Sequence, residues 1–354
     1  MREFLYNLAT DKDKGFLAGV LKFPLLLLSF VYGLLIRCLI LFSRFKISKL
    51  DCKVISVGNI TLGGTGKTSL VQFISSYLKS QKRKVAVLTR GYKKKITNYD
   101  LRLTSYENMG DEPYMLAKNL EDIPVVVDKD RVRGGKKAIR EYGVDTVILD
   151  DGMQQWKIKK DLEIISIDAA NPFGNRYMLP RGILRQPLSS LKFADIFILT
   201  KVNLANTDIN ELKNTLCRFN SKALIFESEH KAVGFYSINS PKELLSKDAL
   251  KGKDAVLFSG IADPDSFKKL SECCGVRVGL VFKFSDHHNY TEEDLNKIML
   301  SSQEKNIGII ITTEKDAARL SGLQFSSPSP QIFVLRMELA IKDEERFFSR
   351  LLSL

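Results

Sequence analysis

A glycine-rich turn between an apolar segment and a helical one constrains the fold of this chain more than any other feature. Residues 54–68 read VISVGNITLGGTGKT, so a β-rich run leads into the turn, and a helix is expected from Ser69. In this context Gly63, Gly64 and Gly66 allow backbone N–H groups to close around phosphate oxygens. The sequence therefore predicts a phosphate-binding loop on an α/β framework.

The end of the turn indicates a nucleoside triphosphate as the ligand. Lys67 is expected to reach the β- and γ-phosphates, and Thr68 to hold Mg²⁺ through its hydroxyl. The strict pattern G-x-x-x-x-G-K-[ST] is not met, because Thr61 occupies the first glycine position. The guanine-reading pattern [NT]-K-x-D is also not met, because residues 200–203 read TKVN, and ATP is therefore favoured over GTP. We assign nucleotide contacts to the whole loop: Gly63, Gly64, Thr65, Gly66, Lys67, Thr68 and Ser69.

Apolar, β-rich segments alternate with helical ones from residue 53 onward. This alternation is typical of βαβ units and a mainly parallel sheet. We expect residues 1–50 to form an N-terminal region, 51–225 a phosphate-loop domain and 226–354 a second, smaller α/β domain. The expected strands are 54–58, 85–89, 124–128, 146–150, 163–168 and 195–200, then 223–227, 255–260, 276–282, 308–312 and 332–335.

Acidic and histidine residues suggest where chemistry takes place. Asp150 and Asp151 follow an expected strand, and we expect them to act on Mg²⁺ directly or through water. Residues 110–113, GDEP, place two acids where a helix begins; one could accept a proton from an attacking hydroxyl, although a helix cap explains them equally well. Residues 285–290, SDHHNY, hold two of the three histidines, and residues 313–316, TEKD, are a candidate contact for adenine or ribose.

One long apolar run precedes the phosphate loop. Residues 23–42 carry a single charge, Arg37, and are long enough to cross a bilayer of about 30 Å. Flanking basic residues place the body of the protein in the cytoplasm by the positive-inside rule. A helix that lies in one leaflet and a buried core helix are the alternatives.

The overall charge points to anionic partners. The net charge of +13 favours nucleic acid, phosphorylated metabolites or acidic lipid. Basic segments at 90–95, 130–133 and 179–185 follow expected strands or adjacent loops, where arginine suits phosphate. The sequence contains no pattern typical of a nucleic-acid-binding module, so we do not expect nucleic acid as a partner.

Taken together, these motifs resemble the tetraacyldisaccharide 4′-kinase family of Gram-negative bacteria. The resemblance covers nearly the whole chain and rests on VGNITLGGTGKT, TRGY, GDEP, DDGMQ, FGNRYMLPRGILRQP, FSGIADP, DHH and TTEKD. It implies that ATP and Mg²⁺ are used to phosphorylate the 4′-hydroxyl of a tetraacylated glucosamine disaccharide 1-phosphate in lipid A biosynthesis. It also implies that the catalytic body faces the cytoplasm at the bacterial inner membrane.

The resemblance assigns roles to individual residues. It implies Asp111 as the catalytic base, His287 as its partner and Lys67 as a catalytic cation, with Thr68, Asp150 and Asp151 on the metal side. The residues that it places near the nucleotide or the substrate headgroup are Tyr92, Glu112, Arg131, Gln154 and Arg185. Two positions depart from the family pattern: Gln155 stands where the family has histidine, and Gln186 where it has glutamate.

Three other functions fit part of the pattern. The first is a membrane-associated phosphate-loop ATPase or GTPase that acts as a switch or metallochaperone. The second is a kinase for a soluble sugar or nucleotide, which the apolar run disfavours. The third is a non-catalytic membrane scaffold, which would leave Lys67, Thr68, Asp150 and Asp151 unexplained.

Overall fold

The computed structural model divides the chain into two compact units. It describes residues 7–11, 13, 15–43, 45, 47–90, 111–120, 122–205, 207–261, 263–286, 288–320 and 330–354. The described residues up to 90 belong to the first unit together with 120–229 and 341–354, and the second unit holds 111–119 and 230–340. The units are not consecutive stretches of chain, because two strands, β7 (Leu224–Ser237) and β12 (Gln331–Ile341), each run from one unit into the other.

The first unit is built on a parallel sheet. Its strand order is β7-β6-β5-β1-β4-β2-β3, and every pair in this series runs parallel. Apart from β7, these strands are mostly buried, as expected for parallel strands whose two faces are both covered. The expected α/β class and mainly parallel sheet are thereby confirmed. The remaining bounds are β1 (Lys53–Gly58), β2 (Val85–Thr89), β3 (Val125–Val127), β4 (Thr146–Asp150), β5 (Leu162–Asp168) and β6 (Ile196–Thr200).

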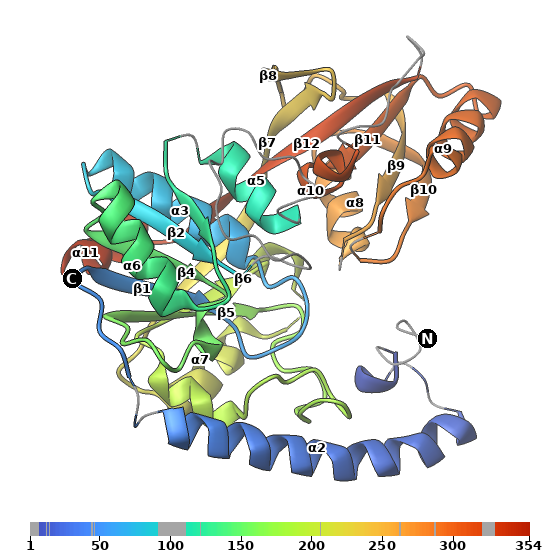
Figure 1. Ribbon diagram of the computed structural model, residues 1–354. Helices are drawn as coiled ribbons and strands as arrows, with labels where there is room; N and C mark the ends of the chain where they lie inside the picture. Colours follow the sequence, from blue (N-terminus) through green and yellow to red (C-terminus); the bar gives the residue numbers. More distant parts are fainter. Residues whose placement is uncertain are drawn as a thin grey trace. The chain divides into compact units, whose positions relative to one another are not determined.

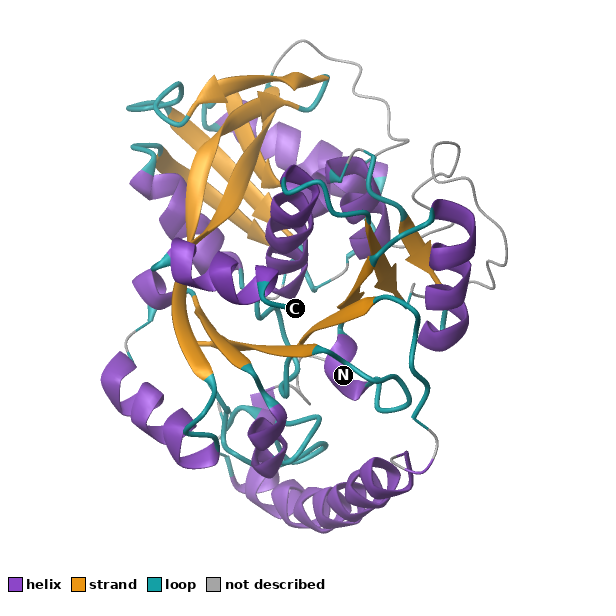
Figure 2. Cartoon of the chain, turned by 90° about the vertical axis from the view of Figure 1, so that its left-hand side faces the viewer, coloured by secondary structure: helices purple, strands orange, loops and turns teal. Residues whose placement is uncertain are grey.

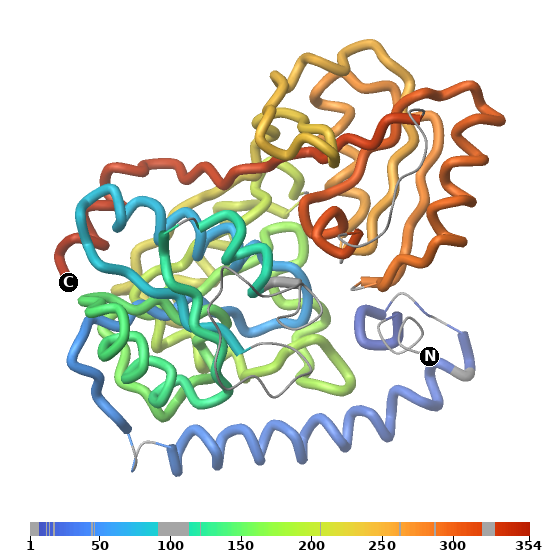
Figure 3. Tube along the Cα trace, turned by 45° about the horizontal axis from the view of Figure 1, so that its top comes forward, coloured from blue at the N-terminus to red at the C-terminus, as the bar shows by residue number. Residues whose placement is uncertain are grey.

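Helices cover the sheet of the first unit on both faces (Figure 2). The chain returns to this unit at its C-terminus (Figure 3), where the ring of Phe348 stacks on Phe73 and Tyr77 of the helix that follows the phosphate loop. The helices are α3 (Lys67–Ser80), α6 (Arg131–Tyr142), α7 (Ile209–Phe219) and α11 (Glu344–Leu352), with short 3₁₀ turns η2 (Gly152–Gln154), η3 (Leu188–Phe193) and η4 (Val202–Leu204).

The second unit has a smaller sheet in the order β10-β9-β11-β12-β7, with β8 antiparallel to β7. The sequence does not predict β8 (Ser240–Ser246), because all seven of its residues are exposed and it carries no buried apolar pattern. The other strands are β9 (Asp254–Ser259), β10 (Arg277–Lys283) and β11 (Ile309–Thr313). The helices are α5 (Asp111–Asn119), α8 (Pro264–Cys273), α9 (Glu292–Glu304) and α10 (Glu314–Arg319).

The apolar run forms one long helix, α2 (Phe16–Ser43), drawn in blue in Figure 1. Within the described residues it is the one helix long and apolar enough to cross a membrane, with a mean hydropathy of 2.5 in the most apolar 18-residue window of Ala18–Ser43. Just 11% of its most apolar window is buried, which argues against a core helix of a soluble protein. The helix is therefore compatible with membrane association.

The packing at the end of β1 gives a first prediction. A Cβ added at Gly58 would lie 2.6 Å from the backbone nitrogen of Met153, in the turn after Asp150 and Asp151. We expect Gly58→Ala to lower the free energy of unfolding by about 1–3 kcal/mol, because the backbone turn must shift to make room. Thermal unfolding measures the loss. Gly308→Ala is the matched control, because a Cβ at that position meets nothing within 4 Å; equal losses in both variants would refute the packing argument.

Candidate active site

The glycine-rich turn connects β1 to the N-terminus of α3. Gly63 and Gly66 adopt φ values of 111° and 75°, in the left-handed region that favours glycine. Gly66 is the N-cap of α3 and supplies no side-chain cap, so the N-terminal N–H groups face the turn. The carbonyl of Thr65 accepts hydrogen bonds from the hydroxyls of Ser166 and Thr200, the latter at 3.2 Å. Strands β5 and β6 thus hold the turn in an arrangement suited to phosphate.

Four side chains meet beside this turn. Lys67 Nζ donates to Asn59 Oδ1 at 3.1 Å and lies 3.7 Å from Asp151 Oδ1. The Arg185 guanidinium forms a fork with Asp151, with N···O distances of 2.8 and 2.7 Å, and also donates to Asn59 Oδ1. We call Asn59, Lys67, Asp151 and Arg185 the cation cluster. The structure therefore brings Lys67, Asp151 and Arg185 together, as the resemblance implies.

Asn59 is the member of the cation cluster that sequence reasoning missed. Its side chain is fully buried, and its amide nitrogen donates to the carbonyl of Thr61 at 2.9 Å. Its oxygen is shared by the two cations, Lys67 and Arg185. The sequence does contain a signal for Asn59: it is a polar residue directly after an expected strand, within the motif VGNITLGGTGKT.

The cation cluster fixes the charge of Asp151. Desolvation works to raise the pKa of its carboxyl, but the Arg185 fork and the Lys67 charge outweigh it and hold the pKa at about 2. Its backbone adopts φ 53°, a left-handed conformation that aspartate tolerates better than most residues. Asp151 is therefore an anion throughout the neutral range, held between two cations.

The neighbouring acid, Asp150, is almost completely buried at the end of β4. Its Oδ2 accepts from Thr89 Oγ1 at 3.1 Å, and its carbonyl lies 3.3 Å from Arg131 Nη2. Arg131 is 2% exposed, and burial lowers its pKa to about 10 although the charges of Asp150 and Asp151 oppose that shift. Arg131 thus lies beneath the acids and supports the end of β4. Gln154 donates from Nε2 to the carbonyl of Asn59 at 3.0 Å.

Polar atoms that lack a partner gather around the phosphate loop. Among the described residues, six buried side-chain nitrogen or oxygen atoms have no hydrogen-bond partner. Four of them surround this region: Thr65 Oγ1, Arg131 Nε, Gln154 Oε1 and Arg185 Nε. A buried polar atom without a partner costs free energy. Their clustering here is consistent with a site that takes up a polar ligand.

The other expected site residues belong to the second unit or are not described. Asp111 and Glu112 begin helix α5, and their side chains lie outside the described residues, as do Tyr92 and His287. Beside position 287, His288 Nε2 lies 2.8 Å from Asp294 Oδ2.

The TEKD segment has a structural role. Asp316 is fully buried and accepts from Gly260 N, Tyr290 Oη, Thr313 Oγ1 and Arg319 Nη1 at 3.0 Å or less. The Asp316 carboxylate therefore helps to hold the second unit together, and an adenine or ribose contact from the other residues of this segment stays a prediction.

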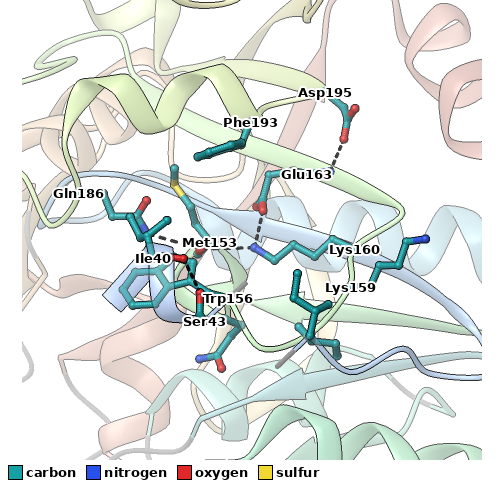
Figure 4. Close-up of a pocket in the computed structure, with 13 residues that line it drawn as sticks. Ile40, Ser43, Met153, Trp156, Lys159, Lys160, Glu163, Gln186, Phe193 and Asp195 are labelled. Carbon is teal, nitrogen blue, oxygen red and sulfur yellow. Dashed lines mark hydrogen bonds and ion pairs between the residues drawn. The ribbon is translucent and has the colours of Figure 1, made fainter. Parts of the chain in front are cut away.

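A pocket of about 290 Å³ is lined by Met153 and Trp156, which follow Asp151 in the chain, and by Lys160 and Glu163 (Figure 4). The two residues that depart from the family pattern, Gln155 and Gln186, both line it. Gln186 Nε2 lies 3.4 Å from the carbonyl of Met153, and Lys160 forms an ion pair with Glu163 in the same pocket. The two departures therefore alter one shared pocket and leave the cation cluster intact.

Known proteins resemble this chain over nearly its whole length. Residues 21–354 match the LpxK family, described as tetraacyldisaccharide-1-P 4′-kinase. A tetraacyldisaccharide 4′-kinase of Halothermothrix orenii is 34% identical, with 97% of this chain and 95% of the relative covered. One from Desulfatibacillum aliphaticivorans is 33% identical, with 95% and 92% covered.

A solved structure agrees with the sequence relatives. LpxK from Aquifex aeolicus, crystallised in complex with ATP, is 30% identical and superimposes with a TM-score of 0.73. The match covers 92% of this chain and 97% of that one. The phosphate loop, the parallel sheet and these relatives together show that the chain belongs to the tetraacyldisaccharide-1-P 4′-kinase family, and that it is a kinase.

Proposed function

We propose that this kinase transfers the γ-phosphoryl group of ATP to the 4′-hydroxyl of a tetraacylated glucosamine disaccharide 1-phosphate. The observation that carries the proposal is the cation cluster at the N-terminus of α3, where Lys67 and Arg185 converge on one anion, Asp151. A site with two cations at the N-terminus of a helix suits a group that develops negative charge on phosphoryl oxygens. The kinase relatives and the ATP complex of the Aquifex aeolicus protein support this assignment.

The phosphate loop provides the donor site. The triphosphate would lie against the N–H groups of residues 63–69, and Lys67 would turn from Asn59 and Asp151 toward the β- and γ-phosphates. Thr68, Asp150 and Asp151 offer a hydroxyl and two carboxylates, the oxygen ligands that Mg²⁺ prefers. When bound there, Mg²⁺ would neutralise charge on the phosphates.

The acceptor hydroxyl needs a base. We assign Asp111 as the base that takes the proton from the 4′-hydroxyl, with His287 orienting and tuning it. We assign contacts with the substrate headgroup to Glu112 and Tyr92. We assign contacts in the region between the headgroup and the γ-phosphate to Gln154 and Arg185. For Arg131, burial beneath Asp150 supports an indirect role, in which it keeps the metal-side acids in place.

The helix α2 would bring the enzyme to its lipid. Its exposed apolar side chains suit insertion into the cytoplasmic leaflet of the bacterial inner membrane, where the tetraacylated substrate resides. The net charge of +13 favours an anionic leaflet and a substrate that already bears a phosphate.

An assay with the lipid acceptor tests the proposed function. We expect the wild type to convert the tetraacylated disaccharide 1-phosphate to the 1,4′-bisphosphate with ATP and Mg²⁺. Lys67→Ala should lower kcat at least about 10²-fold, because an electrostatic contact to the transferred group is lost. Asp111→Ala should lower turnover far more than ATP affinity. The matched control is Lys79→Ala, which removes a half-exposed lysine from the other end of α3.

Two outcomes would contradict the proposal. ATP hydrolysis without phosphorylation of the lipid would favour a membrane-associated switch. If Asp111→Ala weakens ATP binding but leaves turnover at saturation unchanged, Asp111 is not the base.

The pKa of Asp151 gives a prediction about pH. Because its folded-state pKa of about 2 lies below an unfolded value of roughly 3.9, its contribution to stability is complete above about pH 4 and disappears as the pH falls toward 2. Between pH 5 and 9 the carboxylate stays ionised. We therefore expect Asp151→Asn to lower kcat/KM while the inflection points of its pH profile stay at their wild-type positions. A wild-type inflection that disappears in Asp151→Asn would show that Asp151 titrates in this range.

A further inference from the structure

One side of α2 is turned toward the protein along the length of the helix. Ala18, Ser29 and Gly33 are buried, and most of the partly buried residues between and after them continue the same line at intervals of three or four. This spacing places them on one face of a helix. We call this face the inner stripe; it comprises Ala18, Lys22, Leu25, Ser29, Tyr32, Gly33, Ile36, Ile40 and Ser43. The opposite side carries exposed apolar residues such as Phe30 and Leu34.

The inner stripe is bonded to the loop that carries Arg185. Ser29 Oγ lies 2.8 Å from the carbonyl of Met178 and accepts from the backbone nitrogen of Arg181 at 2.9 Å. Tyr32 Oη donates to the carbonyl of Arg185 at 3.1 Å. Two hydroxyl groups of a largely apolar helix therefore contact the backbone of this loop at three points.

The same loop is bonded to the phosphate loop. The backbone nitrogen of Arg185 donates to Ile60 O at 2.7 Å, and that of Leu62 donates to Ile183 O at 2.7 Å. These bonds pair residues 183–185 with the chain that enters the glycine-rich turn. The Arg185 side chain then reaches Asp151 in the cation cluster. A continuous series of direct hydrogen bonds thus leads from Tyr32 to the cation cluster.

A second set of contacts holds this loop from the segment before α2. Arg181 Nη2 donates to both carboxylate oxygens of Asp11, at 2.9 and 3.1 Å, and Asp11 also pairs with Lys22 at 2.7 Å. Asn175 donates to Asp11 at 3.0 Å. Although burial opposes it, hydrogen bonds from Lys22 and Arg181 hold the pKa of Asp11 far below its usual value. The N-terminal segment and α2 therefore both contact residues 175–185 of the first unit.

We propose that α2 is a positioning element of the active site in addition to its role at the membrane. Ser29 and Tyr32 are positioning residues: they hold the backbone of residues 178–185 and thereby set the Arg185 guanidinium against Asp151. The proposal rests on the proposed function for the catalytic role of Arg185. Its consequence is that membrane attachment and phosphoryl transfer depend on two different faces of one helix.

Removal of single hydroxyl groups tests this proposal in the full-length protein, on vesicles of anionic phospholipid that contain the tetraacylated acceptor. We expect Tyr32→Phe to lower kcat about 3- to 10-fold, the range that one hydrogen bond supports. Ser29→Ala should lower kcat by at least as much, because it removes two contacts. Vesicle binding and the KM for ATP should stay at wild-type values. The matched control is Ser43→Ala, which deletes a hydroxyl that donates to Ile40 O of the same helix and should keep the wild-type kcat.

Two further measurements separate positioning from general stability. In an Arg185→Ala background, Tyr32→Phe should cause no additional loss of kcat, because it acts through the missing guanidinium. Amide hydrogen exchange over residues 178–186 should be faster in Tyr32→Phe and Ser29→Ala than in Ser43→Ala or the wild type.

Three results would overturn the proposal: losses of kcat that parallel losses of vesicle binding, the same fractional loss with and without Arg185, or unchanged exchange over residues 178–186. The exchange measurement needs no turnover. If the wild type fails to phosphorylate the lipid, the proposed function is wrong, and the positioning of the loop by α2 is still decided by exchange.

Discussion

The fork between Arg185 and Asp151 is the interaction on which the arrangement of this site depends. Asp151 follows β4 in a left-handed conformation, and Arg185 comes from a loop that returns beside the phosphate loop. Asp151 and Arg185 are 34 residues apart in the sequence, so the local chain geometry does not bring them together. The fork joins them with two charge-assisted hydrogen bonds, and Asn59 adds a neutral acceptor for Arg185 and Lys67. Lys67 and Arg185 thus both lie against the carboxylate of Asp151.

The parallel sheet explains why these residues meet. Asn59 and Asp151 follow β1 and β4, which are adjacent in the sheet, and parallel strands bring their carboxyl ends to one edge. Ser166 and Thr200, on the other side of β1, hold Thr65 from strands β5 and β6. The phosphate loop is thus supported from strands on both sides. The proposed base, Asp111, comes from helix α5, which lies outside this sheet.

Local sequence patterns predicted the parts of this protein that are determined locally. The strands of the first unit appear as buried apolar runs, and the glycines of the turn occupy left-handed positions that few other residues adopt. Three features depend on tertiary contacts and could not be predicted in this way. Arg131 resembles a phosphate ligand in sequence but is buried under β4, Asp316 resembles a nucleotide contact but binds four internal donors, and β8 is exposed throughout.

The sequence of helix α2 nevertheless contains information about a tertiary contact. Its hydrophobicity alone predicts a membrane segment and does not distinguish its sides. A hydroxyl group in an apolar environment needs a hydrogen-bond partner, and a serine in a helix has a carbonyl of the preceding turn within reach. Ser29 Oγ lies 2.9 Å from the carbonyl of Leu25 as well as 2.8 Å from that of Met178, and its one proton is shared between the two. Tyr32 cannot reach its own backbone in this way, so its hydroxyl needs a partner outside the helix. Tyrosine therefore indicates the protein-facing side of this helix better than serine does, and its partner, the carbonyl of Arg185, identifies the part of the site that the helix supports.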